Sequence, residues 1–241
     1  MTLTLDGMPV AVETAGPSRK ARLTVEADGS LAMRAAEDVT EEELQSFLTS
    51  RRRWVYDKLA IKEALAAEAV VKELVTGEGL AYLGRNYRLQ VVGDGDSVTL
   101  QQGRLSLPER LIRQSTGRAA IVAWYSTRGE AWLRPRAEAW AERLRVAPKK
   151  VEVTDLGHKW GSNTPDGRIR IHWATLQLVP RLVEYVLLHE LAHLREPNHG
   201  QAFWETVVRA MPDAHPRKDE LARIGATLWL GAVAEPRRTP A

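Results

Sequence analysis

Three residues within one short segment, His189, Glu190 and His193, have the types and the spacing of a metal-dependent hydrolytic centre. They lie in an apolar stretch that Pro180 opens and that is predicted to be helical to about Arg195. Residues four apart on a helix lie on the same face, so both imidazoles can reach one metal ion. Glu190 follows the first histidine, where its carboxylate can take a proton from a metal-bound water.

A third ligand is expected just beyond the predicted helix. Pro197 ends that helix, and Asn198 tolerates the left-handed conformation that a tight return requires. His199 then follows His193 by six residues, which is the spacing that returns a third histidine to the metal in metzincins. Three imidazoles hold zinc in tetrahedral coordination and leave one position open for water. We therefore predict one zinc ion per chain, bound by His189, His193 and His199.

A carboxylate from the helices that follow is the alternative third ligand, as in thermolysin-like sites. The candidates are Glu205, Asp213, Asp219 and Glu220. We rank His199 ahead of them because the helix break at Pro197 places it correctly for a return to the metal.

Two further side chains are candidates for a catalytic role beside Glu190. Tyr185 lies four residues before His189 on the same helix face, where it can donate a hydrogen bond to an oxyanion or simply pack beside the site. Lys159 can stabilise an oxyanion or bind an anionic substrate, although a lone lysine is more often a surface charge. The predicted catalytic set is therefore Glu190, Tyr185 and Lys159.

Composition excludes several other classes of protein. The chain has 241 residues, of which 44% are hydrophobic and 27% are charged, as is ordinary for a folded protein. It has no cysteine, which excludes disulfides, cysteine-ligated metal sites and a cysteine nucleophile. No apolar run approaches the ~18 residues of a membrane span, and the N-terminus lacks a signal-peptide pattern. We therefore expect a cytoplasmic protein with no membrane partner.

Hydrophobic periodicity predicts an α+β fold whose first part, residues 1–110, is a β-rich N-terminal subdomain with one long helix at about 41–75. Thr40 and Glu43 form a capping box at the start of this helix, and Gly77 and Gly79 mark its end. The predicted strands are 9–13, 21–25, 31–33 and several segments between 80 and 107, with a hairpin turn at Asp28–Gly29.

The second part, residues 111–233, carries the metal centre. A helical pattern runs from about 116 to 144, and Pro135 is expected to start a second helix or to kink the first. The strand at 168–172 precedes the metal helix, and in zincins such a strand is an edge along which an extended peptide can pair, which we also expect here. The remaining predicted elements are a strand at 151–155, helices at 201–211 and 217–229, and a disordered tail at 234–241.

The charge balance leaves two alternative functions open. Lys and Arg number 34 against 31 Asp and Glu, a net charge of +3. The densest basic run, Arg51–Arg53, is read mainly as a solvated helix face, with weak contact to nucleic acid or a nucleotide as the alternative. One alternative function is a zinc-dependent hydrolase of nucleotides or other phosphoanhydrides, with Lys159 holding phosphate. The other is a non-catalytic nucleic-acid-binding protein with a structural metal, although a structural zinc usually has a fourth protein ligand and none is evident.

The metal segment resembles a known family. Residues 183–193 and the residues that follow them resemble the YgjP-like metallopeptidase family, which is related to the SprT-like and WLM-type zinc proteases. The matching residues after the helix are Asn198, His199, Gly200, Phe203 and Trp204. Residues 159–163 and 169–173 resemble the family's Arg-Trp-Gly-Ser-Cys segment and the strand after it, and residues 53–55 and 82–89 fit its N-terminal half.

The resemblance implies a zincin-like metallopeptidase domain, in which the metal-bearing helix lies beneath a twisted sheet. It also implies a zinc-dependent hydrolase that acts on a peptide or protein. The chain departs from the family at Asn163, where the family has Cys, and at Lys159, where it has Arg. Three histidines complete a metal site without that cysteine, and Lys159 keeps the positive charge without the forked geometry of arginine.

Overall fold

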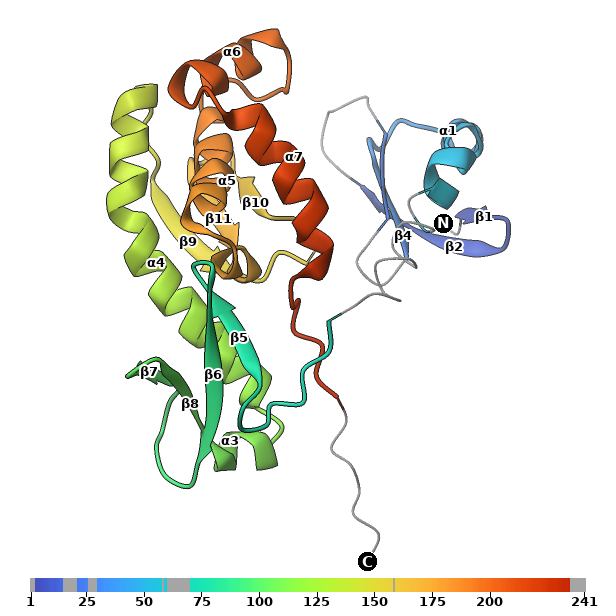
Figure 1. Ribbon diagram of the computed structural model, residues 1–241. Helices are drawn as coiled ribbons and strands as arrows, with labels where there is room; N and C mark the ends of the chain where they lie inside the picture. The colour runs from blue at the N-terminus through green and yellow to red at the C-terminus, as the bar shows by residue number, and fades with distance from the viewer. Residues whose placement is uncertain are drawn as a thin grey trace, which may run out of the picture. The chain divides into compact units, whose positions relative to one another are not determined.

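The computed structural model describes residues 3–14, 21–25, 30–57, 59, 70–157 and 159–234 (Figure 1). They fall into two compact units, Met1–Glu68 and Ala69–Ala241. Both units combine helices with small sheets, which confirms the α+β fold class. The division at residue 68 differs from the expected one near 110, because the strands of residues 79–108 share a core with the helices that follow them. The predicted turn at Asp28–Gly29 and the predicted tail beyond Ala234 lie outside the described residues.

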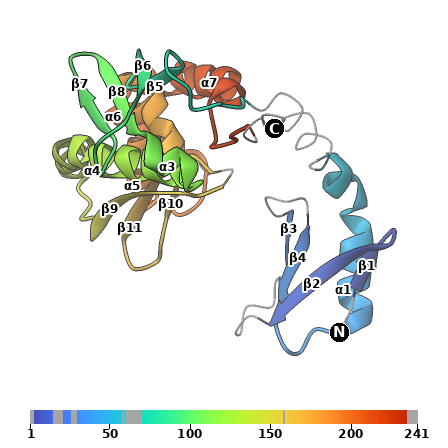
Figure 2. The ribbon, with the colours of Figure 1, turned by 90° about the horizontal axis from the view of Figure 1, so that it is seen from below.

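The first unit is a four-stranded sheet with a helix against it (Figure 2). Its strands are β1 (Leu3–Leu5), β2 (Met8–Thr14), β3 (Arg22–Val25) and β4 (Leu31–Ala35), in the order β1-β2-β4-β3. β2 and β4 pair in parallel, and each outer strand pairs antiparallel with its neighbour. The helix α1 (Glu41–Ser50) buries Leu44 and Leu48 in the small core that the sheet provides.

The start of α1 follows the sequence pattern, whereas the predicted extent of the helix does not hold. The Thr40 hydroxyl accepts a hydrogen bond from the Glu43 amide at 3.3 Å, and the Thr40 amide donates to the Glu43 carboxylate at 2.9 Å, so the capping box is present. After a turn at Arg51, residues 52–57 and 59 are again helical, but residues 70–75 are not, so the predicted helix does not reach residue 75. Lys72 instead exchanges backbone hydrogen bonds with Ala232 and Ala234 near the end of the chain.

A second four-stranded sheet begins the second unit. Its strands are β5 (Gly79–Tyr82), β6 (Arg85–Val92), β7 (Thr99–Gln101) and β8 (Arg104–Pro108), in the order β5-β6-β8-β7. The central strands β6 and β8 are parallel, and their buried Leu89, Leu105 and Leu107 belong to the core that the later helices also line. The short helix α3 (Glu109–Arg113) leads from this sheet into α4 (Gly117–Leu144).

The long helix α4 lies along a third, three-stranded sheet (Figure 1). The strands are β9 (Lys150–Thr154), β10 (Gly161–Asn163) and β11 (Arg168–His172), in the order β10-β11-β9. Gly129 lets α4 approach closely, because a Cβ at this position would lie 3.0 Å from Leu176 and 3.1 Å from Val153. The helix is continuous through Pro135. Of the two expectations for this residue, the start of a second helix is therefore wrong.

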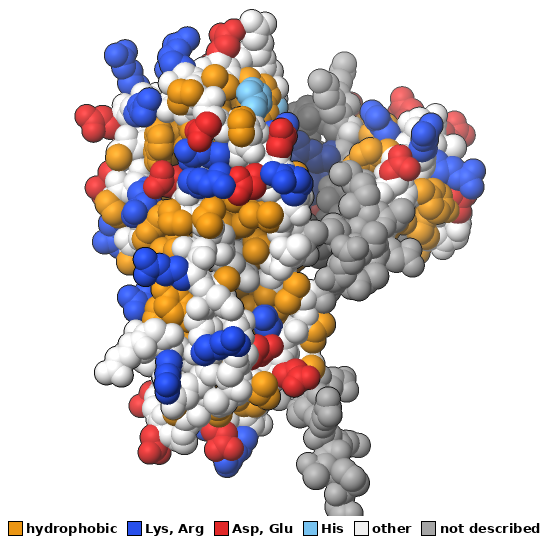
Figure 3. All heavy atoms as spheres, viewed as in Figure 1, with side chains coloured by type: hydrophobic (Ala, Val, Ile, Leu, Met, Phe, Trp, Pro, Cys, Tyr) orange, Lys and Arg blue, Asp and Glu red, His pale blue; other side chains and the backbone are white. Residues whose placement is uncertain are grey.

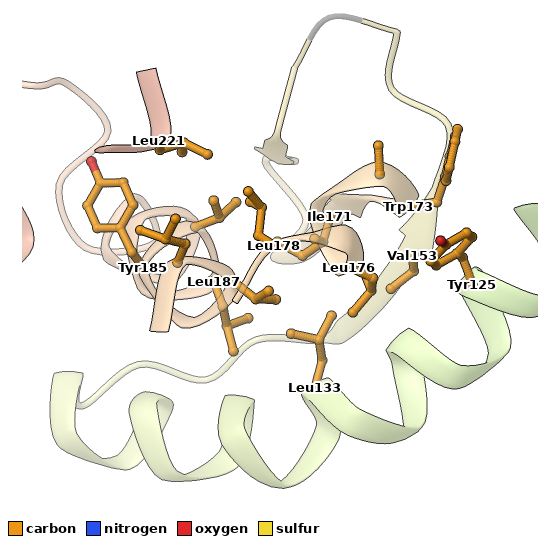
Figure 4. Packing of buried hydrophobic residues seen from close by; sticks show 14 of the residues in the cluster. Tyr125, Leu133, Val153, Ile171, Trp173, Leu176, Leu178, Tyr185, Leu187 and Leu221 are labelled. Atoms are coloured by element: carbon orange, nitrogen blue, oxygen red, sulfur yellow. The ribbon is translucent and has the colours of Figure 1, made fainter. Parts of the chain in front are cut away.

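The helix α5 (Pro180–Ala192) is the centre of this unit. The 3-10 turn η1 (Trp173–Gln177) delivers the chain to it, and Leu187 on α5 packs in the same core as Leu133 on α4 and Leu176 in η1 (Figure 4). A helix that is apolar on nearly all sides is a core helix, so a buried Glu190 on it requires a special explanation. The remaining elements are α6 (Gln201–Ala210), α7 (Ala214–Ile224) and the turn η2 (Gly225–Thr227). None of the helices in the described ranges has the length and apolarity that crossing a bilayer requires.

Candidate metal centre

Three imidazoles meet at the end of α5. His189 lies in the last turn of the helix, His193 is its C-terminal cap, and His199 returns from the loop before α6. The Nε2 atom of His199 lies 2.9 Å from Nε2 of His189 and 3.0 Å from Nε2 of His193. No other group of three potential metal ligands gathers in the part of the chain that the structure describes.

The geometry of this donor set fits zinc. Zinc binds imidazole nitrogen at about 2.0–2.1 Å, which places tetrahedral ligand atoms about 3.3 Å apart, close to the separations found here. Nδ1 of His193 lies 3.1 Å from the Glu196 carbonyl oxygen. A proton held there on Nδ1 leaves the lone pair of Nε2 for the metal, which is the usual role of a hydrogen bond behind a histidine ligand.

The local environment also keeps the ligands in the form that binds metal. Burial, with smaller contributions from the neighbouring histidines, lowers the pKa of His189 to about 4. Burial likewise lowers the pKa of His193. Because a metal ligand must be the neutral imidazole, both side chains are ready to bind at neutral pH without first losing a proton.

Phe203 holds the three rings together. It is fully buried on α6, and its ring centroid lies 4.9 Å from that of His189, 4.5 Å from His193 and 4.9 Å from His199. Trp204 stacks on His199 at 6.3 Å. From the sequence we interpret Phe203 and Trp204 as packing residues and not as substrate contacts, and both rings pack against the metal ligands from α6.

Glu190 lies beside the three histidines and is only 8% exposed. Burial raises its pKa to about 7, and the positive charge of Lys159 partly opposes that shift. A Cβ on Gly161 of β10 would lie 2.5 Å from Cγ of Glu190. The carboxylate therefore packs directly against the backbone of the edge strand, and only glycine leaves room for it.

A pocket of about 390 Å³ opens beside Glu190 and His189. Both remaining predicted catalytic residues line it: Lys159 is exposed at its surface, and Tyr185 is buried with its pKa raised to about 12, mainly by burial. Lys218 of α7 is a second cation on the same pocket, and its ammonium group lies 5.0 Å from the Trp204 ring centroid. The apolar part of the lining comes from Trp160, Val186, Leu221 and Ala222.

The alternative third ligands are engaged elsewhere. Glu205 accepts a hydrogen bond from Gln201 at 2.7 Å. Asp213 pairs with Arg217 at 2.9 Å, and Glu220 pairs with Arg181 at 2.5 Å. None of these carboxylates, nor Asp219, belongs to the ligand group in the described residues.

The strand expected to be the edge is the central strand of its sheet. β11 has β9 on one side and β10 on the other, so its backbone is already paired. His172 at its end is buried, with Nδ1 accepting from the Ala174 amide at 3.0 Å and Nε2 3.3 Å from Asp155. The edge strands among the described residues are β9 and β10, and β10 contacts Glu190 through Gly161.

A comparison with known protein families identifies a metallopeptidase family for this chain. A family model described as the YgjP-like metallopeptidase domain matches residues 19–224. A comparison with curated proteins finds no match. The crystal structure of the metallopeptidase zymogen of Pyrococcus abyssi abylysin shares 24% identity over 39% of this chain and 95% of its own, with a TM-score of 0.36, too low to show a common fold.

Proposed function

Because this chain belongs to the YgjP-like metallopeptidase family, we propose that it is a zinc-dependent peptidase with His189, His193 and His199 as metal ligands and Glu190 as general base. The observation that carries the proposal is the convergence of three Nε2 atoms beside a buried carboxyl group whose pKa is raised to about 7. A base with a pKa near the working pH is well suited to take up a proton and release it again.

The proposed reaction combines the bound metal with three side chains of the pocket. Bound zinc would lower the pKa of a water molecule and polarise the scissile carbonyl. Glu190 would take the proton from that water and pass it to the leaving amine. Tyr185 stays protonated at neutral pH because its pKa is about 12, so its hydroxyl can donate a hydrogen bond to the developing oxyanion. Lys159 would add positive charge at the same pocket.

The substrate we propose is a peptide or protein segment in the extended conformation. Within the part of the chain that the structure describes, β10 pairs only with β11, which leaves its outer backbone edge for a further strand. Gly161 of β10 packs against the side chain of Glu190, so a peptide paired with β10 would pass close to the base. We place this reaction in the cytoplasm.

Zinc content and peptide turnover, measured on the same preparations, test the proposal. Wild type should hold about one zinc, His199→Ala should lose it, and Glu190→Gln should keep it while turnover falls by roughly 10²–10⁴-fold. Glu142→Gln, at an exposed position on α4, is the matched control and should change neither quantity. Nucleotides serve as comparison substrates, and zinc-dependent hydrolysis of nucleotides without peptide cleavage would replace the proposal by the phosphoanhydride alternative.

A further inference from the structure

A hollow of about 310 Å³ lies in the second unit where three helices end. α4 ends at Leu144, α5 ends at Ala192 and α6 ends at Ala210. Four arginines line the hollow, together with Thr206: Arg143 and Arg145 from the end of α4, Arg195 after α5, and Arg209 in the last turn of α6. Figure 3 shows several Lys and Arg side chains over the ends of α4 and α6.

These four guanidinium groups have no carboxylate partner among the described residues. Elsewhere in the unit, arginines pair with acids, as Arg136 does with Glu184 at 3.2 Å. Within the described residues, by contrast, no carboxylate oxygen lies within 4.0 Å of the guanidinium nitrogens that line the hollow. Arg143 makes one aromatic contact, with its Cζ atom 5.4 Å from the Trp140 ring. No acidic side chain is among the described residues that line the hollow.

The helix ends account for part of this charge but not for all of it. A helix C-terminus carries roughly half a negative charge, so three ends supply about 1.5 negative charges. Four guanidinium groups carry four full positive charges. More than two positive charges therefore remain around one hollow, which is the charge that a phosphate or diphosphate group would balance.

We propose that this hollow is a binding site for a compact phosphate-bearing small molecule. The planar guanidinium group can bind phosphate through two parallel hydrogen bonds, and the Thr206 hydroxyl can add another donor. The arginines surround one hollow instead of forming a stripe along the surface. This arrangement suits a compact polyanion better than an extended nucleic-acid backbone, which needs charges spaced along its length.

The site is separate from the pocket beside the metal centre, because the two share no lining residue. It is nevertheless connected to it through the chain. Arg195 belongs to the loop between His193 and His199, and Thr206 and Arg209 belong to the same helix as Phe203, which packs on the three imidazoles. The proposal rests on the arginine cluster alone and does not depend on peptidase activity.

Isothermal titration of the full chain with pyrophosphate, inorganic phosphate, ATP and a short single-stranded oligonucleotide, at physiological salt, tests the proposal. We expect pyrophosphate and ATP to bind at one site per chain. Binding should weaken by about tenfold or more in the double variant Arg143→Ala/Arg209→Ala, and likewise in the single variant Arg195→Ala. The reason is that each lost hydrogen bond to a charged group reduces the binding free energy by at least as much as a tenfold change requires.

The matched control is the double variant Arg85→Ala/Arg104→Ala, which removes the same charge from exposed arginines of β6 and β8 in the same unit. It should bind within about twofold of wild type, since distant exposed charges are largely screened. Circular dichroism and the melting temperature show that each variant is folded, and Arg209→Lys supplies a mild second variant that keeps the charge. Absence of pyrophosphate and ATP binding to the wild type overturns the proposal, as does equal weakening in the control or binding of the oligonucleotide alone.

Discussion

At the scale of single residues, the environment of Glu190 leads to a prediction about the metal-free protein. Burial raises the pKa of this carboxyl group from 4.5 to about 7, so the folded state binds the proton more tightly than the unfolded state does. The stability that protonation supplies is complete below about pH 4.5 and is lost as the pH rises towards 7. Because a shift of one pKa unit corresponds to about 1.4 kcal/mol, the loss should be on the order of 3 kcal/mol.

Glu190→Gln is the variant that isolates this effect, because glutamine stays neutral at every pH. The quantity to measure, in the presence of a chelator, is the difference between the melting temperatures of the wild type and the variant. This difference should decrease as the pH is raised from 4.5 to 7, and it should stay constant above pH 7. A difference that is independent of pH over this range would mean that Glu190 is ionised in the folded metal-free protein at a normal pKa.

The two lysines on the pocket lead to a prediction about substrate preference. Lys159 and Lys218 place two ammonium groups next to apolar side chains in the pocket that contains Glu190. Peptides with Asp or Glu beside the scissile bond should therefore be cleaved with a higher kcat/KM than matched peptides with Asn or Gln. Lys218→Gln should reduce this preference by about threefold, because Lys218 is exposed and an exposed charge pair contributes at most about 1 kcal/mol.

Two variants show whether the charge itself is responsible. Lys218→Arg should retain most of the preference, and Lys149→Gln, which lies outside the pocket, should leave it unchanged. A preference that survives Lys218→Gln intact would assign the selectivity to another part of the pocket.

The sequence could identify the residues whose relation is local, and it could not identify those that meet through the fold. His189, Glu190, His193 and His199 lie within eleven consecutive positions, so helical spacing and one helix break are enough to bring them together. Lys218 is on a different helix, and its place in the pocket depends on how α7 packs against α5. No spacing in the sequence encodes that contact.

At the scale of elements, the contact between β10 and α5 leads to a further prediction. Gly161→Ala would place a methyl group 2.5 Å from Cγ of Glu190, a distance at which one of the two must move. The displaced carboxylate would no longer be aligned with a metal-bound water. We therefore expect turnover to fall by roughly a hundredfold while zinc content is unchanged, because a small misplacement of a catalytic group has effects of this size.

Gly93→Ala is the matched control for this substitution, since no atom lies within 4 Å of the Cβ it would add and its backbone is not in the left-handed region. That variant should retain the activity of the wild type. Loss of zinc from Gly161→Ala would indicate that the whole end of α5 has moved, and normal turnover would show that β10 adjusts to the methyl group without displacing Glu190.

The same distinction between local and distant contacts explains which elements were predictable. Thr40 and Glu43 fix the start of α1 through hydrogen bonds to each other, and both residues are visible in the sequence. The sequence pattern predicts Gly77 as the end of a long helix, but its φ of 95° belongs to a turn before β5. The segment before that turn is held by Lys72 and the distant Ala232, which pair only in the folded chain.

At the scale of the whole molecule, the position of the boundary between the two parts follows from two separate cores. One core contains Leu44 and Leu48 with the strands of the first unit, and the other contains the strands of residues 79–108 with α4 and α5. The sequence placed the boundary near 110 because strand-rich and helix-rich segments change there. Packing places it at residue 68, since β6 and β8 bury their leucines against helices that come later in the chain.

The second unit contains every residue of the proposed metal centre and a core of its own, so it should bind zinc without the first unit. Residues 69–241 expressed alone should hold about one zinc per chain and unfold cooperatively. A chelator should lower their melting temperature, because the metal binds only the folded state.

The double variant Leu44→Asp/Leu48→Asp of the whole chain, which destroys the core of the first unit, should keep its zinc as well. The family match begins at residue 19 and so includes most of the first unit. If both proteins retain zinc and cleave short peptides but lose activity on an unfolded protein, the first unit contributes to binding large substrates. Loss of zinc from both would show that the metal centre depends on the first unit and that the two cores do not fold independently.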